Sequence, residues 1–268
     1  MDFHPPQSTA TENIYTPLFR VIPCKALSFF DPLYWVWLGW QDFKKAPLHA
    51  LFYGLPFLAV TYFIATLVYV TQNYLLIFVF VSAFMWMSPV LAYGFYNISR
   101  QLYQQKTPSL KRSLRCVLRN KVATWSFAAL LGFYCFFWTQ IAGIILFFYP
   151  AAHPADIQAL LLFYTIGSSA GFILASIIFS LSAFSMPLLM ERRVSVPTAI
   201  ASSLNVVVKN PLTCALWAFI IFMAVMIGIA TFGIGLVFTL PTIGFGTWHA
   251  YRQTLHRQRS HDHHWRFL

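Results

Sequence analysis

Long apolar stretches separated by short polar ones dominate the chain. Each stretch is close to or above the ~20 residues that cross a ~30 Å hydrocarbon layer as an α-helix. Helices are expected, because an open sheet leaves backbone groups unpaired in lipid. The pattern therefore predicts an all-α, polytopic membrane protein with six transmembrane helices. The six runs are Ala46–Val70, Leu75–Ile98, Val122–Tyr149, Ile157–Leu189, Pro211–Thr231 and Gly233–Tyr251.

The positive charges follow this pattern closely. All 18 Lys and Arg residues lie before the first run, between the second and third, between the fourth and fifth, or after the sixth. Basic residues collect in cytoplasmic loops, so the split predicts that both termini are cytoplasmic. The predicted organisation is a tail at 1–27, a membrane domain at 28–252 and a His- and Arg-rich tail at 253–268.

Composition supports the membrane assignment. Hydrophobic residues make up 59% of the chain and charged residues 9%, whereas soluble domains carry about 25% charged residues. A net charge of +11 suggests nucleic acid in a soluble protein, but here loop cations account for it, and no nucleic-acid partner is predicted. The four cysteines show no framework spacing, so no disulfide scaffold is implied.

The sequence also contains an internal similarity. Pro, Gly, Arg and Gln fall at the same offsets in the segments 89–101 and 241–253, and Lys45-Ala-Pro47 matches Lys209-Asn-Pro211. We interpret the chain as three helical hairpins that enter and leave on the same side, and hence as parallel repeats. Chance similarity between apolar segments is the alternative.

Each predicted hairpin follows an amphipathic stretch: Pro32–Lys45, Pro108–Lys121 and Pro197–Asn210. In the first, Leu33, Val36, Trp37 and Trp40 share a helical face. Such helices lie in the membrane interface, where cations contact anionic head groups; an acidic protein partner is the alternative. The predicted lipid or partner contacts are Lys111, Arg112, Arg115 and Arg119.

Ionisable groups are scarce within the runs. None contains Asp, Glu, Lys or Arg, although ion-coupled transporters and proton relays need such groups in the membrane. No nucleophile with a base is visible along the sequence, so no enzyme activity is predicted. Prolines at 56, 89, 187 and 241 fit either kinked helices or the broken helices of a transporter site.

Histidines supply the weak cofactor candidates. His49 and His249 lie near the ends of the first and last runs, where they fit haem ligation or a plain interfacial role. A His-rich tail is typical of divalent metal binding, but we favour the alternative of a mobile tail with weak, adventitious affinity. We predict no cofactor, with haem or a tail-bound metal as alternatives. The tail residues are His256, His261, His263 and His264.

Small residues mark one candidate packing face. Gly167, Gly171 and Ala175 follow one side of the fourth run, and such spacing allows close helix approach. These three positions are the predicted contact with another helix.

Several segments together resemble a known family. They are Trp40-Gln-Asp42-Phe-Lys44, the stretch 185–192 and Gly246-Thr247-Trp248-His249-Ala250-Tyr251-Arg252, with Asn210-Pro211 between them. This pattern resembles the bacterial predicted integral membrane proteins called domain of unknown function 2189. The resemblance runs from about Asp31 to Arg252 and implies a bacterial inner-membrane location without an assigned activity. Glu191 departs from the family, which tends to have Asp there.

Some relatives in that family carry a loose label as cytochrome c oxidase subunits. We therefore expect a non-catalytic accessory or assembly subunit of an inner-membrane complex, with a respiratory terminal oxidase as an example. Its partners are membrane lipids and another integral membrane protein. The alternative is a transporter or channel for an uncharged or lipid-like solute.

Overall fold

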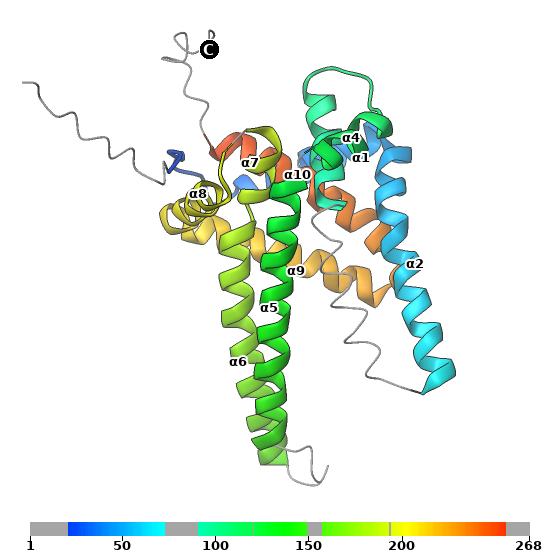
Figure 1. Ribbon diagram of the computed structural model, residues 1–268, viewed down its shortest axis with the longest axis vertical. Helices are drawn as coiled ribbons and strands as arrows, with labels where there is room; N and C mark the ends of the chain where they lie inside the picture. The colour runs from blue at the N-terminus through cyan, green and yellow to red at the C-terminus, as the bar shows by residue number, and fades with distance from the viewer. Residues whose placement is uncertain (1–20, 73–90, 120, 149–156, 193, 256–268) are drawn as a thin grey trace, which may run out of the picture.

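The computed structural model describes residues 21–72, 91–119, 121–148, 157–192 and 194–255, and most of these residues are helical (Figure 1). A further helix covers 91–103. The remaining helices are α1 (Asp31–Lys45), α2 (Pro47–Thr71), α4 (Leu110–Arg119), α5 (Lys121–Phe148), α6 (Ile157–Ser182), α7 (Ser185–Glu191), α8 (Val196–Lys209), α9 (Pro211–Ala230) and α10 (Leu236–Thr254).

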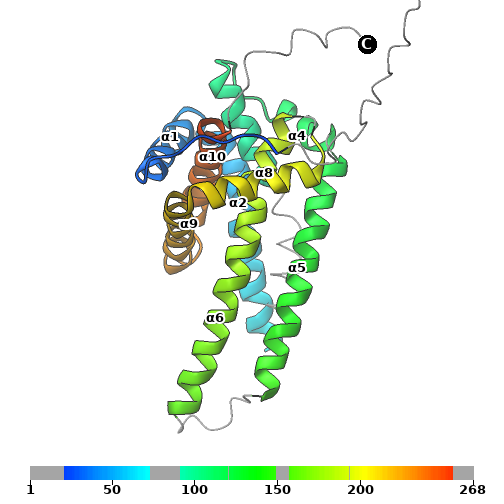
Figure 2. The ribbon, with the colours of Figure 1, turned by 90° about the vertical axis from the view of Figure 1, so that its left-hand side faces the viewer.

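The helices gather at one end of the molecule. The helices α1, α4, α7 and α8 lie at this end with the C-terminal part of α10, while α2, α5 and α6 extend away from it (Figure 1). The helix α9 runs obliquely to α5 and α6 in Figure 1 and is seen nearly end-on in Figure 2. It is therefore not parallel to the α5–α6 hairpin.

An aromatic core fills the crowded end. Trp35, Trp217 and Trp248 are all buried, and the rings of Trp35 and Trp217 meet edge to face with centroids 5.4 Å apart. The far ends of the long helices are instead exposed: Tyr69 is 78% and Phe147 is 79% accessible. Large apolar side chains on an open surface indicate contact with lipid or with another protein.

Within the described residues, three apolar helical stretches are long enough to cross a membrane: Pro47–Thr71, Leu161–Glu191, which includes α7, and Pro211–Ala230. The helices α2, α5, α9 and α10 coincide within a few residues with four predicted runs. Most of the second predicted run lies outside the described residues, and only its end falls within the helix 91–103.

The fourth predicted run is not one straight helix, which corrects the sequence-based prediction. It breaks at Ala183 and Phe184, between α6 and α7. Pro187 explains the break, because its ring excludes the carbonyl four residues earlier and it has no N–H to donate. Ser203 of α8 accepts a hydrogen bond from the Phe184 N–H (3.2 Å) and donates to the Ser180 carbonyl (2.8 Å). The broken turn is thus held by a neighbouring helix.

The predicted amphipathic stretches form α1, α4 and α8, each directly before a long helix. In α8 the small or polar residues Thr198, Ala199, Ser202 and Ser203 are buried together with Val206, whereas Leu204 and Val208 on the predicted apolar face are exposed, Val208 by 75%. A soluble protein buries the apolar face of such a helix. Exposure of these two side chains fits a helix whose apolar side meets lipid.

Two features support the predicted repeat between the first and third hairpins. Ala46 links α1 to α2 with φ −136° and ψ 54°, and Asn210 links α8 to α9 with φ −131° and ψ 56°. In addition, Gly94 packs directly on the Tyr53 ring, and Gly246 packs on the Trp217 ring. Tyr53 and Trp217 both stand six residues after the helix-initiating proline, so the two contacts are equivalent.

Residues 21–30 form a strap across the C-terminal helices. The Ile22 N–H donates to Ser202 Oγ (3.0 Å), and the Leu27 N–H donates to Asn210 Oδ1 (2.8 Å). The Lys25 N–H donates to the Thr254 carbonyl (3.0 Å). The strap therefore places residues assigned by sequence to a tail against α8 and the end of α10.

Candidate functional site

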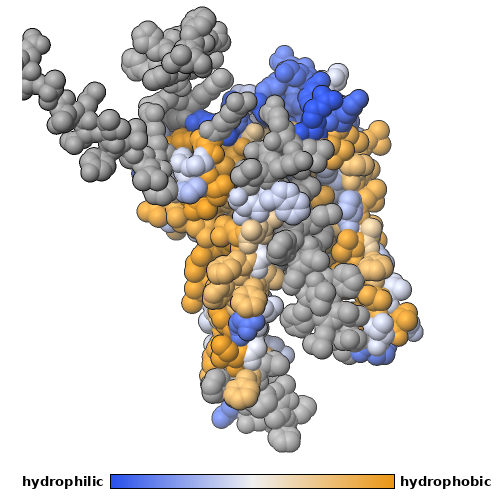
Figure 3. All heavy atoms as spheres, in the orientation of Figure 1, coloured by the Kyte–Doolittle hydropathy of each residue, from blue (hydrophilic) through white to orange (hydrophobic). Residues whose placement is uncertain are grey.

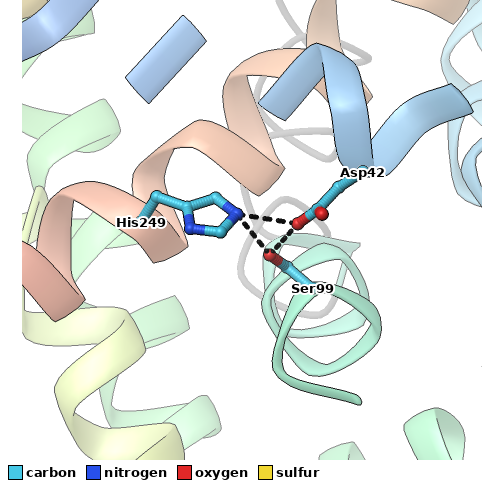
Figure 4. A network of polar contacts seen from close by, with 3 residues as sticks. All are labelled: Asp42, Ser99 and His249. Atoms are coloured by element: carbon cyan, nitrogen blue, oxygen red, sulfur yellow. Dashed lines mark hydrogen bonds and ion pairs between the residues drawn. The ribbon is translucent and has the colours of Figure 1, made fainter. Parts of the chain in front are cut away.

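A buried polar cluster joins three segments that are distant in the sequence (Figure 4). Ser99 Oγ donates to Asp42 Oδ2 over 2.5 Å, His249 Nε2 lies 2.8 Å from the same oxygen, and Ser99 Oγ lies 3.3 Å from that nitrogen. Asp42 comes from α1, Ser99 from the helix 91–103 and His249 from α10. We call these three residues the polar latch.

Local sequence explains how α1 presents its carboxylate. Trp35, Gly39, Asp42 and Phe43 are spaced as one helical face, and this face is buried. Asp42 is only 5% exposed. A carboxylate removed from water needs hydrogen-bonded partners, and Ser99 and His249 supply them.

Glycine allows α1 to reach α10. A Cβ on Gly39 would collide with the Thr242 carbonyl oxygen and would lie 2.8 Å from the Gly246 nitrogen, while a Cβ on Gly246 would lie 3.0 Å from the Trp35 carbonyl oxygen. The two backbones are therefore in direct contact, as at the small-residue crossings of membrane helices. This crossing brings Asp42 to His249.

The latch combines Ser, His and Asp, residue types that also form hydrolytic triads. In a triad the acid binds one imidazole nitrogen and the nucleophile binds the other. Here Asp42 and Ser99 both meet Nε2, and Ser99 donates its proton directly to the carboxylate. This arrangement is that of a polar tie between helices rather than of an activated serine.

A second polar cluster lies one helical turn away on α10. Tyr251 Oη donates to Glu191 Oε2 (2.5 Å), and the Arg252 guanidinium donates to Glu191 Oε1 (3.1 Å) and to Tyr103 Oη (3.1 Å). The guanidinium also lies 4.6 Å from the Tyr103 ring centroid, a cation–π distance. Burial lowers the pKa of Arg252, but Tyr103 and Glu191 outweigh it, and the pKa is raised overall.

Further hydrogen bonds tie the amphipathic helices to the core. Trp35 Nε1 donates to Gln253 Oε1 (2.6 Å), and Tyr53 Oη donates to Ser113 Oγ (2.8 Å). Because Ser113 belongs to α4, the basic helix is fixed to α2. Sequence analysis did not identify these pairs, because their members are separated by up to 218 positions.

The four basic residues predicted to contact lipid or a partner differ in their surroundings. Lys111 and Arg115 are exposed on α4, whereas Arg112 Nη1 donates to Gln101 Oε1 over 3.2 Å. The Arg119 backbone ends α4, and its side chain is outside the described part. Hydrophilic residues gather at the upper right of the molecule, above the apolar flanks (Figure 3).

The predicted helix-contact residues differ from one another. A Cβ on Gly167 would meet nothing within 4 Å, whereas a Cβ on Gly171 would lie 3.0 Å from the Trp138 ring. Ala175 is exposed. Gly171 therefore serves α5–α6 packing, and Gly167, four residues earlier on the same side of α6, has open space around it.

The histidines predicted as cofactor or metal ligands also differ from one another in position. His249 belongs to the polar latch, and His49 is half-buried near the start of α2. Among the described residues, no group of three or more His, Cys, Asp or Glu side chains is arranged to hold a metal ion. His256, His261, His263 and His264 lie outside the described residues, so their predicted metal binding stays a prediction.

The class of protein follows from three features: apolar helices of spanning length, the exposed apolar side of the amphipathic helix α8, and a polar end. Together they define a predicted integral membrane protein. Residues 75–191 match the family described as "Predicted integral membrane protein (DUF2189)", which confirms the resemblance over that stretch. The quoted segments around Asp42 and His249 lie outside the match. No curated protein and no solved structure matches the chain.

Proposed function

We propose that the protein crosses a bacterial inner membrane six times as three hairpins, with both termini in the cytoplasm. The positive-inside rule supports this topology, because every Lys and Arg falls on one side of it. The gathering of α1, α4, α7 and α8 at one end fits a cytoplasmic cap (Figure 1), and Lys111 and Arg115 on that cap suit anionic head groups.

Within this membrane the protein serves as a non-catalytic accessory or assembly subunit of a larger complex. One observation carries the proposal: on the outer face of α6 the small residue Ala175 is exposed, and Phe172, three residues earlier on the same face, is 75% exposed. A large apolar side chain next to a small residue offers a ridge and a groove to a partner helix. A respiratory complex is the first partner to test.

The test is purification from native membranes in mild detergent, followed by mass spectrometry and an absorption spectrum. A stoichiometric membrane partner is expected, together with a haem spectrum if that partner is a terminal oxidase. Ala175→Leu should fill the groove beside Phe172 and release the partner while leaving the monomer folded.

The matched variant is Ala129→Leu on α5, which is also exposed. It should retain the partner. Recovery of the native protein alone, or gradient-dependent solute uptake by the pure protein in liposomes, would contradict the proposal.

A further inference from the structure

A cavity of about 440 Å³, largely open to the surroundings, lies between the helices. Seven of the described helices contribute to its wall, through Phe57, Phe95, Phe127, Ile178, Met186, Trp217 and Ile243. Tyr96 and Thr247 also line it, and they stand within three residues of Ser99 and His249 in the same helices. The cavity is therefore adjacent to the polar end of the protein.

The chemistry of the wall selects an apolar occupant. Among the lining residues Tyr96, Ser182 and Thr247 carry hydroxyl groups, and Thr247 already donates to the Ile243 carbonyl over 2.8 Å. Most of the wall is apolar, so hydrocarbon fits it better than water, which needs two to four polar partners. Because the cavity is open rather than enclosed, a chain from the bilayer can enter it, and the volume is within the ~300–1,000 Å³ range of ligand sites.

We propose that this cavity binds one acyl chain of a membrane phospholipid. Within a bilayer, acyl chains surround the exposed apolar faces of α2, α5 and α6 and are the most abundant hydrocarbon. Arg100 supports a phospholipid as the source. It stands four residues after Tyr96 on the same helical face, and its Nε has no hydrogen-bond partner among the described residues. A lipid phosphate is a suitable acceptor there.

The experiment uses the full-length protein in vesicles that contain phosphatidylglycerol with a photoreactive diazirine in the middle of one acyl chain. After illumination, mass spectrometry locates the labelled peptides. Labelling is expected on the cavity wall, in the peptides of Met186 and Ile243, in addition to the outer faces of α5 and α6.

Ala183→Phe places a ring in the cavity and should reduce the inner labelling at least fivefold without changing the outer labelling. The control is Ala129→Phe, an exposed position on α5 that does not line the cavity, and it should leave the inner labelling unchanged. Ala92→Phe fills the same cavity from the helix 91–103 and serves if the first variant fails to fold.

A second arm distinguishes the source of the chain. Unlabelled phosphatidylglycerol should suppress the inner labelling, whereas an isoprenoid quinone at the same concentration should leave it unchanged. Inner labelling that persists in both cavity-filling variants, labelling confined to the outer faces, or suppression by the quinone alone would overturn the proposal. None of these outcomes depends on the accessory-subunit proposal, because no partner protein is present.

Discussion

His249 Nε2 and Asp42 Oδ2 lie 2.8 Å apart although their residues are separated by 207 positions. The pair joins the amphipathic helix α1 to the last helix α10, and Ser99 adds the helix 91–103. One carboxylate oxygen thus connects three segments of the chain. This connection depends on the close backbone crossing of Gly39 and Gly246.

Asp42→Ala should destabilise the protein by about 2 kcal/mol, because it removes an acceptor bound by two buried side chains. The measurement is the thermal unfolding midpoint in detergent. Asp31→Ala is the matched control: that carboxylate also lies on α1, but it accepts an exposed bond from the Ser28 N–H, and its loss should cost less than about 1 kcal/mol. Equal midpoints for the two variants would contradict a structural role for the latch.

Gly39→Ala should prevent α1 from docking on α10, because the new Cβ has no room against the Thr242 carbonyl. We expect low yield of folded protein and faster proteolysis of the N-terminal segment. Gly143→Ala is the control, since its Cβ meets nothing within 4 Å, and it should be neutral or slightly stabilising. Normal proteolytic resistance of the Gly39 variant would show that the crossing is looser than described.

Glu191→Gln should cost less than Asp42→Ala, because Glu191 and Arg252 are each about one-fifth to one-quarter exposed. Partly exposed ion pairs contribute less than buried ones, and salt screens them. The difference in unfolding midpoint between wild type and Glu191→Gln should therefore shrink as salt is raised from 0.05 to 1 M. A difference that salt does not change would indicate that the pair is fully shielded.

Cysteine labelling tests the proposed topology. Ile234 lies between α9 and α10 and is 53% exposed. In a cysteine-free background, Ile234→Cys should react with an impermeant maleimide from outside intact cells. Gln104→Cys and Ser195→Cys should react only after the membrane is opened. The reverse labelling pattern at any of these three positions would exclude the six-span arrangement with cytoplasmic termini.

The sequence was sufficient for the helical architecture. Apolar runs predict α2, α5, α9 and α10 because lipid imposes a helix length, and the proline-initiated amphipathic stretches predict α1, α4 and α8. Pro187 pointed to a kink or a break before α7, but which of the two forms depends on Ser203, a partner from another helix.

The site was less accessible to sequence reasoning. Asp42 and His249 both stand in segments quoted for the family resemblance, yet nothing in their spacing indicates that they meet. Small residues on α6 were chosen for helix contact, whereas the tightest crossing uses Gly39 and Gly246. Contact between distant helices follows from three-dimensional packing, which one-dimensional periodicity does not encode.

The strap sets an order of events during biosynthesis. Ile22, Lys25 and Leu27 leave the ribosome early, but their acceptors Ser202, Asn210 and Thr254 belong to the last helices. The segment therefore has to wait until α10 has been made before its backbone is satisfied. The strap therefore closes only after α10 has been made, and a truncation before α8 would remove all three acceptors.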